Sequence, residues 1–286
     1  IEEAIKYPKE KVASLCYISK NEKKNILKAT GEISSCLTNN TIVEFFESQV
    51  INNPDSIALV FDNRQLSYSQ FNELANKLAH YLIAEHGVGP GELIGIKLER
   101  NEWIIISILA VLKTGAAYVP LDIELPEERL VNHYNISNYI TSISETYGVT
   151  SEDRFVLFSN ISFDASIEQI FLPFVNGGRL YVLSKESLLN TDKFMAFLVA
   201  NEITHLHATP SFLNTLPVGN LKSLKRIVSA GERCPVELAE RWADKCDFYN
   251  KYGPTEATIS ATIYLVNNAT VSENNIPIGR PIRNST

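Results

Sequence analysis

The decisive stretch of this sequence is Asn250-Lys251-Tyr252-Gly253-Pro254-Thr255-Glu256. Gly253-Pro254 predicts a turn, and the apolar pair Phe248-Tyr249 before it predicts the end of a strand. Such a turn places three functional groups close together at the end of the strand: the aromatic ring of Tyr252, the hydroxyl donor of Thr255 and the carboxylate of Glu256, a hard oxygen ligand. For a Tyr-Gly-Pro sequence taken by itself, the alternative to a functional site is a surface turn with ordinary polar residues.

The composition sets the broad class of protein. With 286 residues, 45% of them hydrophobic, the chain is long enough to bury a large core. The net charge of −7 and the lack of a Lys/Arg-rich block argue against a nucleic-acid partner. The longest apolar run, 103–112, is too short to span a bilayer, and no signal peptide precedes it, so no membrane partner is expected. Cys16, Cys36, Cys234 and Cys246 have no disulfide or metal spacing, which predicts reduced thiols and a cytoplasmic location.

Hydrophobic periodicity predicts an alternation of strands and helices. Ser67 and Gln70 form a capping box, and an apolar helical face then continues until His86-Gly87. The pattern predicts strands at 93–98, 116–121, 180–183, 203–208 and 226–229, and helices from Asn101 to Gly115 and at 167–175, 192–200 and 236–246. Nearly all-apolar strands between helices predict an α/β fold with buried, largely parallel sheets.

Five segments, taken with residues 250–256, resemble the adenylate-forming enzymes, in particular the amino-acid adenylation domains of nonribosomal peptide synthetases. They are 66–75 (LSYSQFNELA), 112–122 (LKTGAAYVPLD), 163–166 (FDAS), 229–232 (SAGE) and 276–281 (IPIGRP), in the order that the family has them. The resemblance implies the large N-terminal subdomain of the adenylate-forming fold, with layered sheets flanked by helices, over residues 41–286. Residues 1–40 resemble the connector after an upstream, condensation-type domain, with a disordered tail as the alternative.

Two parts of the family pattern are missing. The family has a Thr/Ser/Gly-rich phosphate loop between its second motif and the Phe-Asp segment, whereas here residues 126–130 run directly into 131–135. We therefore expect several tens of residues to be missing at the 130/131 junction. The small C-terminal subdomain, with its catalytic lysine, is expected to be absent after Thr286. The resemblance thus implies an ATP-dependent ligase that is incomplete as given.

The resemblance implies a nucleotide site and a magnesium site. It assigns Tyr252 to stacking on adenine, Asn250 to the amino edge of the base, Thr255 to the α-phosphate and Glu256 to Mg²⁺, with Thr255 and Glu256 as the catalytic pair. The full set that it implies for ATP is Ala230, Gly231, Glu232, Asn250, Lys251, Tyr252, Gly253 and Thr255. Glycine at position 231 allows a close approach of the backbone to the base.

Asp164 marks the class of acid that the enzyme accepts. In the resemblance, its carboxylate pairs with the α-ammonium group of an amino acid, which selects amino acids over plain carboxylic acids. The alternative is that Asp164 only caps the helix that follows. Two histidines, His205 and His207, share one face of a strand, but two ligands without a third are weak evidence for zinc.

The amino-acid pocket implied by the resemblance is polar. It consists of Asp164, Ala165, Glu168, His207, Val228, Ala230, Lys251, Ile259 and Ser260. Besides Asp164, the three ionisable groups Glu168, His207 and Lys251 predict a polar or charged substrate side chain. Glu168 suits a cationic end, Lys251 and His207 suit an anionic or amide end, and Glu168 and Lys251 can instead neutralise each other.

The expected activity converts an amino acid and ATP to aminoacyl-AMP and pyrophosphate and then loads the acyl group onto a phosphopantetheine thiol. The partners implied are the carrier-protein and condensation domains of the same synthetase, with a small MbtH-like helper as a further candidate. Two alternatives are an acyl-CoA or aryl acid ligase of the same superfamily and a degenerate adenylation domain that acts as a scaffold.

Overall fold

The computed structural model describes residues 40–121, 133–219, 221–266 and 275–283. The 130/131 junction and residues 1–39 of the expected connector lie outside the described residues. The helices are α3 (Ile42–Asn52), α4 (Tyr68–His86), α5 (Glu102–Lys113), α6 (His133–Tyr147), α7 (Ala165–Val175), α8 (Lys185–Leu189), α9 (Thr191–Ala200), α10 (Pro210–Thr215), α11 (Val236–Ala243) and the 3₁₀ turn η2 (Thr255–Ala257).

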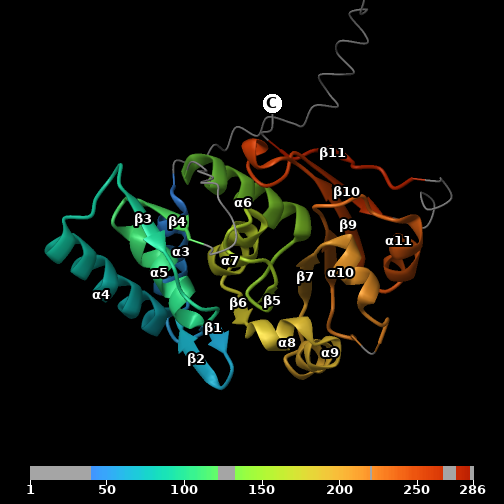
Figure 1. The fold of residues 1–286 in the computed structure, drawn as a ribbon, viewed down its shortest axis with the longest axis horizontal. Coiled ribbons are helices and arrows are strands. Elements are labelled where there is room, and N and C mark those ends of the chain that lie inside the picture. The colour runs from blue at the N-terminus through green and yellow to red at the C-terminus, as the bar shows by residue number, and fades with distance from the viewer. Residues whose placement is uncertain (1–39, 122–132, 220, 267–274, 284–286) are drawn as a thin grey trace, which may run out of the picture.

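The described strands form one large sheet and one small sheet (Figure 1). They are β1 (Ile57–Phe61), β2 (Arg64–Ser67), β3 (Leu93–Ile96), β4 (Ala117–Pro120), β5 (Arg154–Leu157), β6 (Arg179–Val182), β7 (His205–Ala208), β8 (Arg226–Ser229), β9 (Asp247–Tyr252), β10 (Thr262–Val266) and β11 (Arg280–Pro281). The large sheet has the order β11-β10-β9-β8-β7-β5-β6-β1-β2, and β3 pairs with β4 separately. The α/β class expected from the sequence is confirmed.

The centre of the large sheet is parallel and its edges are antiparallel. Strands β1, β6, β5, β7, β8 and β9 run parallel to one another. Strand β2 pairs antiparallel with β1, and β10 pairs antiparallel with both β9 and β11. Figure 1 places β3 and β4 with α4 and α5 at one end of the molecule, and β10 with α11 at the other.

Two hydrophobic cores lie on the two faces of this sheet. In β5, Phe155 and Leu157 belong to the core that contains α3 to α7, whereas Val156 belongs to the core that contains α9 and α11. In β8, Val228 joins the first core and Ile227 the second. This alternation is the two-residue period of a strand that is buried on both faces. Residues 155–157 of β5, 180–182 of β6 and 227–228 of β8 are accordingly apolar on both faces.

Local signals in the sequence set several element ends. Ser67 caps α4 by accepting a hydrogen bond from the backbone N–H of Gln70, and Gly87 ends the helix with a left-handed φ of 67°. Asn101 caps α5 by accepting from the backbone N–H of Trp103. No helix within the described ranges has both the length and the apolar character that a bilayer crossing requires.

Several element ends differ from the expectations, including those of β9, α7 and α11. Strand β9 continues through Tyr252 instead of ending at Tyr249, because Lys251 and Tyr252 pair with Ile263 and Thr262 of β10. Helix α7 begins at Ala165, before Ser166, and α11 ends at Ala243, before Cys246. The extension of β9 matters for function, because it places Asn250, Lys251 and Tyr252, the first three residues of the 250–256 stretch, in a strand.

A buried ionic cluster stabilises the amino-terminal edge of the central strands. The Asp153 carboxylate is fully buried and pairs with Arg226 (Nη2–Oδ2, 2.5 Å) and Lys225 (Nζ–Oδ1, 3.0 Å). It also accepts hydrogen bonds from the Thr150 N–H and the Thr204 hydroxyl. Burial alone would raise the pKa of Asp153, but the Thr150 hydrogen bond and the two cations outweigh it and lower the pKa to about 2.

We expect Asp153→Asn to lower the free energy of unfolding at neutral pH by about 3 kcal/mol, because it leaves Arg226 buried beside a neutral group. The pKa of aspartate in an unfolded chain is about 3.9, so the lowered native pKa stabilises the fold above about pH 4 and less as the pH falls towards 2. Urea unfolding at several pH values measures both effects. In the variant, the part of the acid dependence that comes from this group should disappear.

The control is Glu202→Gln, which removes the exposed partner of Arg154. Exposed ion pairs contribute at most about 1 kcal/mol, so this variant should unfold close to wild type. Equal losses from the two substitutions would contradict the importance of the Asp153 cluster.

Candidate active site

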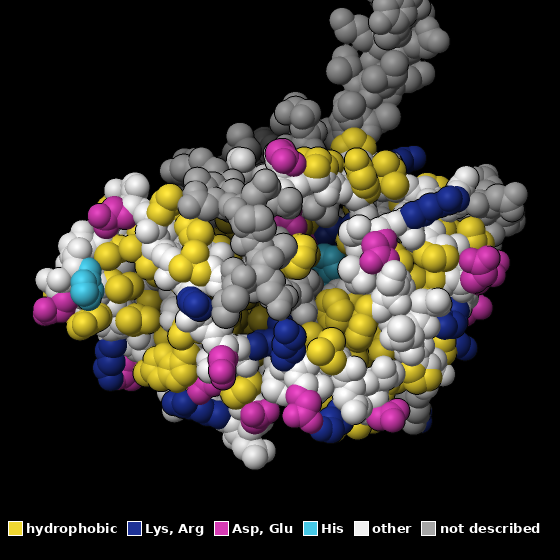
Figure 2. Space-filling view, viewed as in Figure 1, with side chains coloured by type: hydrophobic (Ala, Val, Ile, Leu, Met, Phe, Trp, Pro, Cys, Tyr) yellow, Lys and Arg dark blue, Asp and Glu magenta, His cyan; other side chains and the backbone are white. Residues whose placement is uncertain are grey.

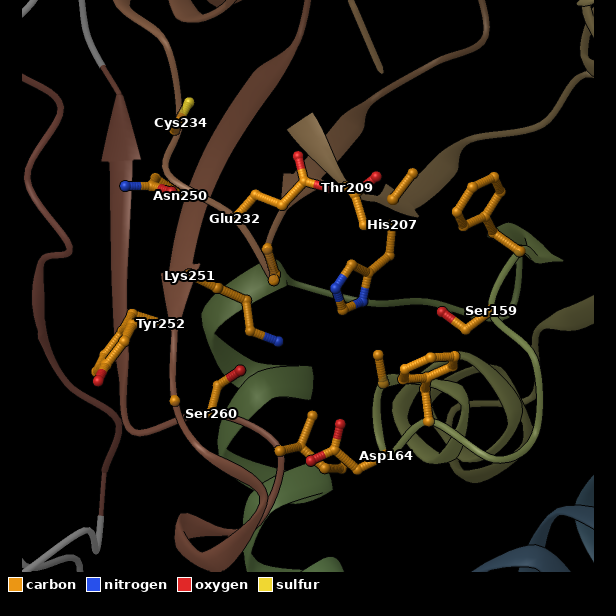
Figure 3. A pocket seen from close by; sticks show the side chains of 18 of the residues that line it. Ser159, Asp164, His207, Thr209, Glu232, Cys234, Asn250, Lys251, Tyr252 and Ser260 are labelled. Atoms are coloured by element: carbon orange, nitrogen blue, oxygen red, sulfur yellow. The ribbon is translucent and has the colours of Figure 1, made fainter. Parts of the chain in front are cut away.

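A cavity of about 760 Å³ lies at the carboxyl ends of β5, β7, β8 and β9 (Figure 3). Ligands of open parallel sheets bind at this edge, where the loops after successive strands converge. The lining residues are Phe158, Ser159, Asn160, Phe163, Asp164, Ala165, His207, Ala208, Thr209, Ala230, Gly231, Glu232, Arg233, Cys234, Asn250, Lys251, Tyr252, Gly253, Ile259, Ser260, Ile276 and Ile278.

The end of β9 presents consecutive side chains to opposite sides. Figure 3 shows Lys251 reaching towards His207, whereas Asn250 and Tyr252 project from the other side of the strand. Tyr252 is 55% exposed and lines the cavity, so its ring is available for stacking. The Asn250 amide nitrogen donates to the Pro277 carbonyl (2.9 Å). This bond leaves the amide oxygen of Asn250 to accept from a ligand amino group.

Gly253 is required where β9 ends. A Cβ at this position would lie 2.3 Å from Ser260 Cα and 2.5 Å from Ala261 N, both backbone atoms. The absence of a side chain therefore lets the loop that carries Ile259 and Ser260 press against the end of β9. Beyond the turn, Thr255 and Glu256 form part of η2, and Glu256 is exposed.

The loop after β8 supplies the opposite wall. Gly231 has a φ of 87°, which favours glycine, and its missing side chain leaves backbone exposed to the cavity. The adjacent Glu232 carboxylate accepts hydrogen bonds from the backbone N–H (3.0 Å) and the hydroxyl of Ser211, at the start of α10. Glu232 thereby links the loop after β8 to the first turn of α10.

Asp164 occupies the N-cap position of α7, but its side chain makes no capping hydrogen bond. The alternative that Asp164 serves only as a helix cap is therefore not supported. The carboxylate lines the cavity and is partly buried (Figure 3). It is thus placed to receive a cation there.

A buried polar cluster lies behind the cavity wall. Glu168 is fully buried and pairs through Oε2 with Lys251 Nζ and with the Tyr139 hydroxyl, while its Oε1 lies 3.3 Å from His207 Nδ1. Lys251 Nζ also donates to the Tyr139 oxygen (2.5 Å). Burial alone would raise the pKa of Glu168, but Lys251 and His207 outweigh it and hold that pKa below its ordinary value. Burial lowers the pKa of Lys251, and the Glu168 carboxylate opposes this shift.

Two further side chains hold the cavity walls and were missed by the sequence analysis. The Gln169 amide oxygen accepts from the backbone N–H groups of Phe158 and Ser159 (both 2.9 Å), and its nitrogen donates to the His207 carbonyl (3.2 Å). Arg100 donates to the carbonyls of Leu157, Ser159 and Leu183. Burial lowers the pKa of its guanidinium to about 10. A polar residue next to Glu168 in the mainly apolar helix 165–175 was the available signal for Gln169.

The structure brings most of the sequence-predicted site residues to one cavity. Those that line it are Asp164, Ala165, His207, Ala230, Gly231, Glu232, Asn250, Lys251, Tyr252, Gly253, Ile259 and Ser260. Four others do not line it: Glu168 lies behind Lys251, Val228 is in the core, and Thr255 and Glu256 are on η2. The roles assigned to these residues remain predictions.

The histidine pair is divided between two environments. His205 lies among aromatic rings, with its ring centroid 4.5 Å from that of Phe155 and 5.4 Å from that of Tyr147, and burial lowers its pKa. Only His207 reaches the cavity. Within the described ranges, no three His, Cys, Asp or Glu side chains gather as a metal site. On the face drawn in Figure 2, acidic and basic side chains are interspersed.

Comparison with known proteins identifies the family. The family described as AMP-binding enzyme matches residues 46–135 and 130–286, so the chain belongs to this family. Tyrocidine synthase 1 of Brevibacillus parabrevis is 30% identical over 318 residues, which cover 86% of this chain and 29% of that protein. Bacitracin synthase 2 of Bacillus licheniformis is 25% identical over 355 residues, covering 99% of this chain and 14% of the relative. The chain therefore spans less than a third of either relative.

Solved structures have the same fold. A four-domain nonribosomal peptide synthetase in its holo form, bound to AMP and glycine, superimposes with a TM-score of 0.86 at 22% identity, covering 99% of this chain and 26% of that one. The nonribosomal peptide synthetase FmoA3 in its α-methyl-L-serine-AMP bound form gives a TM-score of 0.84 at 20% identity, with 93% of this chain and 39% of that one covered. Together with the family match, these relatives confirm the resemblance to adenylation domains of peptide synthetases.

We expect Gly253→Ala to destabilise the fold by about 1–3 kcal/mol, because the new Cβ forces the Ser260 backbone away from β9. AMP affinity, measured by calorimetry, should fall at the same time, since Tyr252 and Asn250 share this strand end. Gly89→Ala is the matched control, because a Cβ there meets no atom within 4 Å and φ is not left-handed. The control should change stability by no more than about 0.5 kcal/mol. Equal effects of both variants would show that the contact with Ser260 is unimportant.

Proposed function

We propose that this protein activates an amino acid with ATP, forming aminoacyl-AMP and pyrophosphate, and passes the acyl group to a carrier-bound phosphopantetheine thiol. The observation that carries the proposal is the position of Asp164. Its carboxylate is not used for helix capping, and it lines the same cavity as Gly231, Asn250 and Tyr252. A site for an ammonium group therefore adjoins a site for a flat, hydrogen-bonding base.

The residues present fit a nucleotide. Adenine would stack on the exposed face of Tyr252, beside the backbone at Gly231, and donate its amino hydrogen to the Asn250 oxygen, which the bond to Pro277 leaves available. Thr255 would contact the α-phosphate. The exposed Glu256 carboxylate is a hard oxygen donor of the kind that Mg²⁺ prefers, and the ion would neutralise phosphate charge.

In the first step, a carboxylate oxygen of the amino acid attacks the α-phosphorus of ATP. The bond from this phosphorus to the bridging oxygen breaks, and pyrophosphate leaves with the bonding electrons. In the second step, the thiolate attacks the acyl carbon and AMP leaves. Asp164 binds the α-ammonium group and so holds the attacking carboxylate in place, which lowers the barrier through orientation. Carrier-protein and condensation domains, and an MbtH-like helper, are the partners that this proposal includes.

One observation favours a second candidate, a degenerate domain that binds nucleotide without catalysis. The alignment with bacitracin synthase 2 runs over 355 positions, although this chain has 286 residues, so the relative contains several tens of residues without a counterpart here. A missing phosphate loop would account for such a difference. An acyl-CoA or aryl acid ligase is less well supported, because it has no use for the Asp164 carboxylate.

ATP–pyrophosphate exchange on the full-length product of the gene, tested with each of twenty amino acids and with simple carboxylic acids, separates these candidates. Exchange that depends on one amino acid or a few similar ones supports the proposal. AMP binding without exchange for any acid indicates the scaffold. Exchange driven by acids without an amino group indicates the acyl or aryl ligase.

We expect Asp164→Ala to raise the amino-acid KM in this assay at least about 100-fold, because it removes one partner of a buried ion pair. AMP affinity should stay close to wild type, since the base contacts lie on the far side of β9. Asp192→Ala, an exposed aspartate on α9, is the control and should leave both values unchanged. An amino-acid KM that hardly moved in Asp164→Ala would remove the ammonium-binding role.

A further inference from the structure

The buried cluster of Glu168, Lys251, Tyr139 and His207 bears on which amino acid the cavity accepts. This inference rests on the proposed function and concerns the end of the substrate side chain. The cluster joins α6, α7, β7 and β9 behind the cavity wall. Two of its members, His207 and Lys251, reach the cavity. A substrate side chain would therefore meet His207 and Lys251, and the charge on these two residues is partly neutralised by Glu168.

Glu168 does not offer its carboxylate to the cavity. Its side chain is 0% exposed, as is that of Lys251, but unlike Lys251 it is not among the residues that line the cavity. Oε2 is engaged by Lys251 Nζ and the Tyr139 hydroxyl, and Oε1 faces His207 Nδ1 at 3.3 Å. A cationic substrate side chain would have to displace Lys251 to reach this carboxylate, and it would meet the Lys251 charge first. Lysine-like and arginine-like ends are therefore disfavoured.

Lys251 has one N–H bond that is not used within the cluster. An ammonium group has three N–H bonds, and within the described part of the chain Lys251 uses two, to Glu168 and to the Tyr139 oxygen. In Figure 3 the amine points towards the space between His207, Ser260 and Asp164, which line the cavity together with Lys251. A substrate with an aliphatic end would leave this N–H buried without an acceptor, which costs free energy. The wall therefore selects for a hydrogen-bond acceptor.

The charge balance decides between a neutral and an anionic acceptor. Glu168 already neutralises Lys251 at direct contact, and the substrate ammonium group would neutralise Asp164. A substrate carboxylate would share one cation with Glu168 and leave a net negative charge in a buried site. An amide or hydroxyl oxygen accepts the same N–H without that penalty.

We propose that the cavity is built for an amino acid with a neutral, hydrogen-bond-accepting side chain, such as a carboxamide or a hydroxyl, and that Glu168 acts as the internal counter-ion that excludes acidic substrates. Tyr139 is a positioning residue, which holds Lys251 and Glu168 together from α6. If Glu168 were uncharged, Lys251 would be free to bind an anionic substrate side chain.

The test compares amide and acid pairs that differ only in charge. In pyrophosphate exchange, we expect glutamine or asparagine, or a hydroxyl amino acid, to exceed lysine, ornithine and leucine by more than tenfold in kcat/KM. Glutamine and asparagine should likewise exceed glutamate and aspartate. A preference for a cationic or aliphatic amino acid, or for an acidic one in the wild type, would overturn the inference.

Glu168→Gln should reverse the amide-to-acid preference, so that glutamate or aspartate becomes better than its amide by about tenfold or more. Glu186→Gln is the matched control, because this carboxylate pairs with Lys193 on the surface, where the Glu186 side chain is 78% exposed, and does not line the cavity. The control should keep the wild-type preference. An unchanged preference in Glu168→Gln would overturn the counter-ion role.

A second measurement does not depend on activity. Glu168→Gln should lower the Tm, because it leaves Lys251 buried and unpaired, and adding Lys251→Met should raise the Tm back towards wild type. Absence of exchange with every amino acid would refute the proposed function, and this rescue would still decide whether Glu168 and Lys251 form the inferred pair. A double variant that is no more stable than Glu168→Gln would overturn it.

Discussion

Parallel pairing of β5, β7, β8 and β9 is the constraint on which the rest of this structure depends. Strands that run parallel end at the same edge, so four loops that are far apart in the sequence meet there. Asp164 comes from the segment after β5, His207 from β7, Gly231 from the loop after β8 and Lys251 from β9. No local signal in the sequence brings these four residues within one cavity, and the strand ladder alone does so.

The two edges of the parallel strands use buried charge in different ways. At the amino-terminal edge, Asp153 is surrounded by donors and cations, and the result is a closed ionic cluster that stabilises the fold. At the carboxyl-terminal edge, the Glu168–Lys251 pair is equally buried, but Lys251 also faces the cavity. A buried ion pair with one open side can act as a recognition surface, whereas a closed one can only contribute to stability.

The walls of the cavity depend on side chains that bind backbone. Gln169 and Arg100 both hold the segment around Ser159, which follows β5, and Gln169 also holds the His207 carbonyl. Irregular backbone at the end of a strand has unpaired N–H and C=O groups, and these two side chains satisfy them. The residues that line the cavity therefore rest on a second set of side chains, which lies outside the motif segments quoted from the sequence.

Much about this protein follows from its sequence alone. The capping box at Ser67, the left-handed glycine at Gly87 and the apolar strands predict the α/β class, because these signals act between residues that are close along the chain. Motif order assigned the family, which the comparisons confirm. The sequence also placed Asp164 and the 250–256 stretch in one candidate site. It left open whether Glu168 faces a substrate or Lys251, and it did not find Tyr139, Gln169 or Arg100.

Only the tertiary structure decided those points. Strand β9 extends through Tyr252 because its last two residues pair with β10, and that extension sends Lys251 to one side and Tyr252 to the other. Lys251 then meets Glu168 and Tyr139 from helices 83 and 112 residues away in the sequence. The direction of a buried carboxylate depends on which cation the fold places beside it, and no pattern along the chain contains that information.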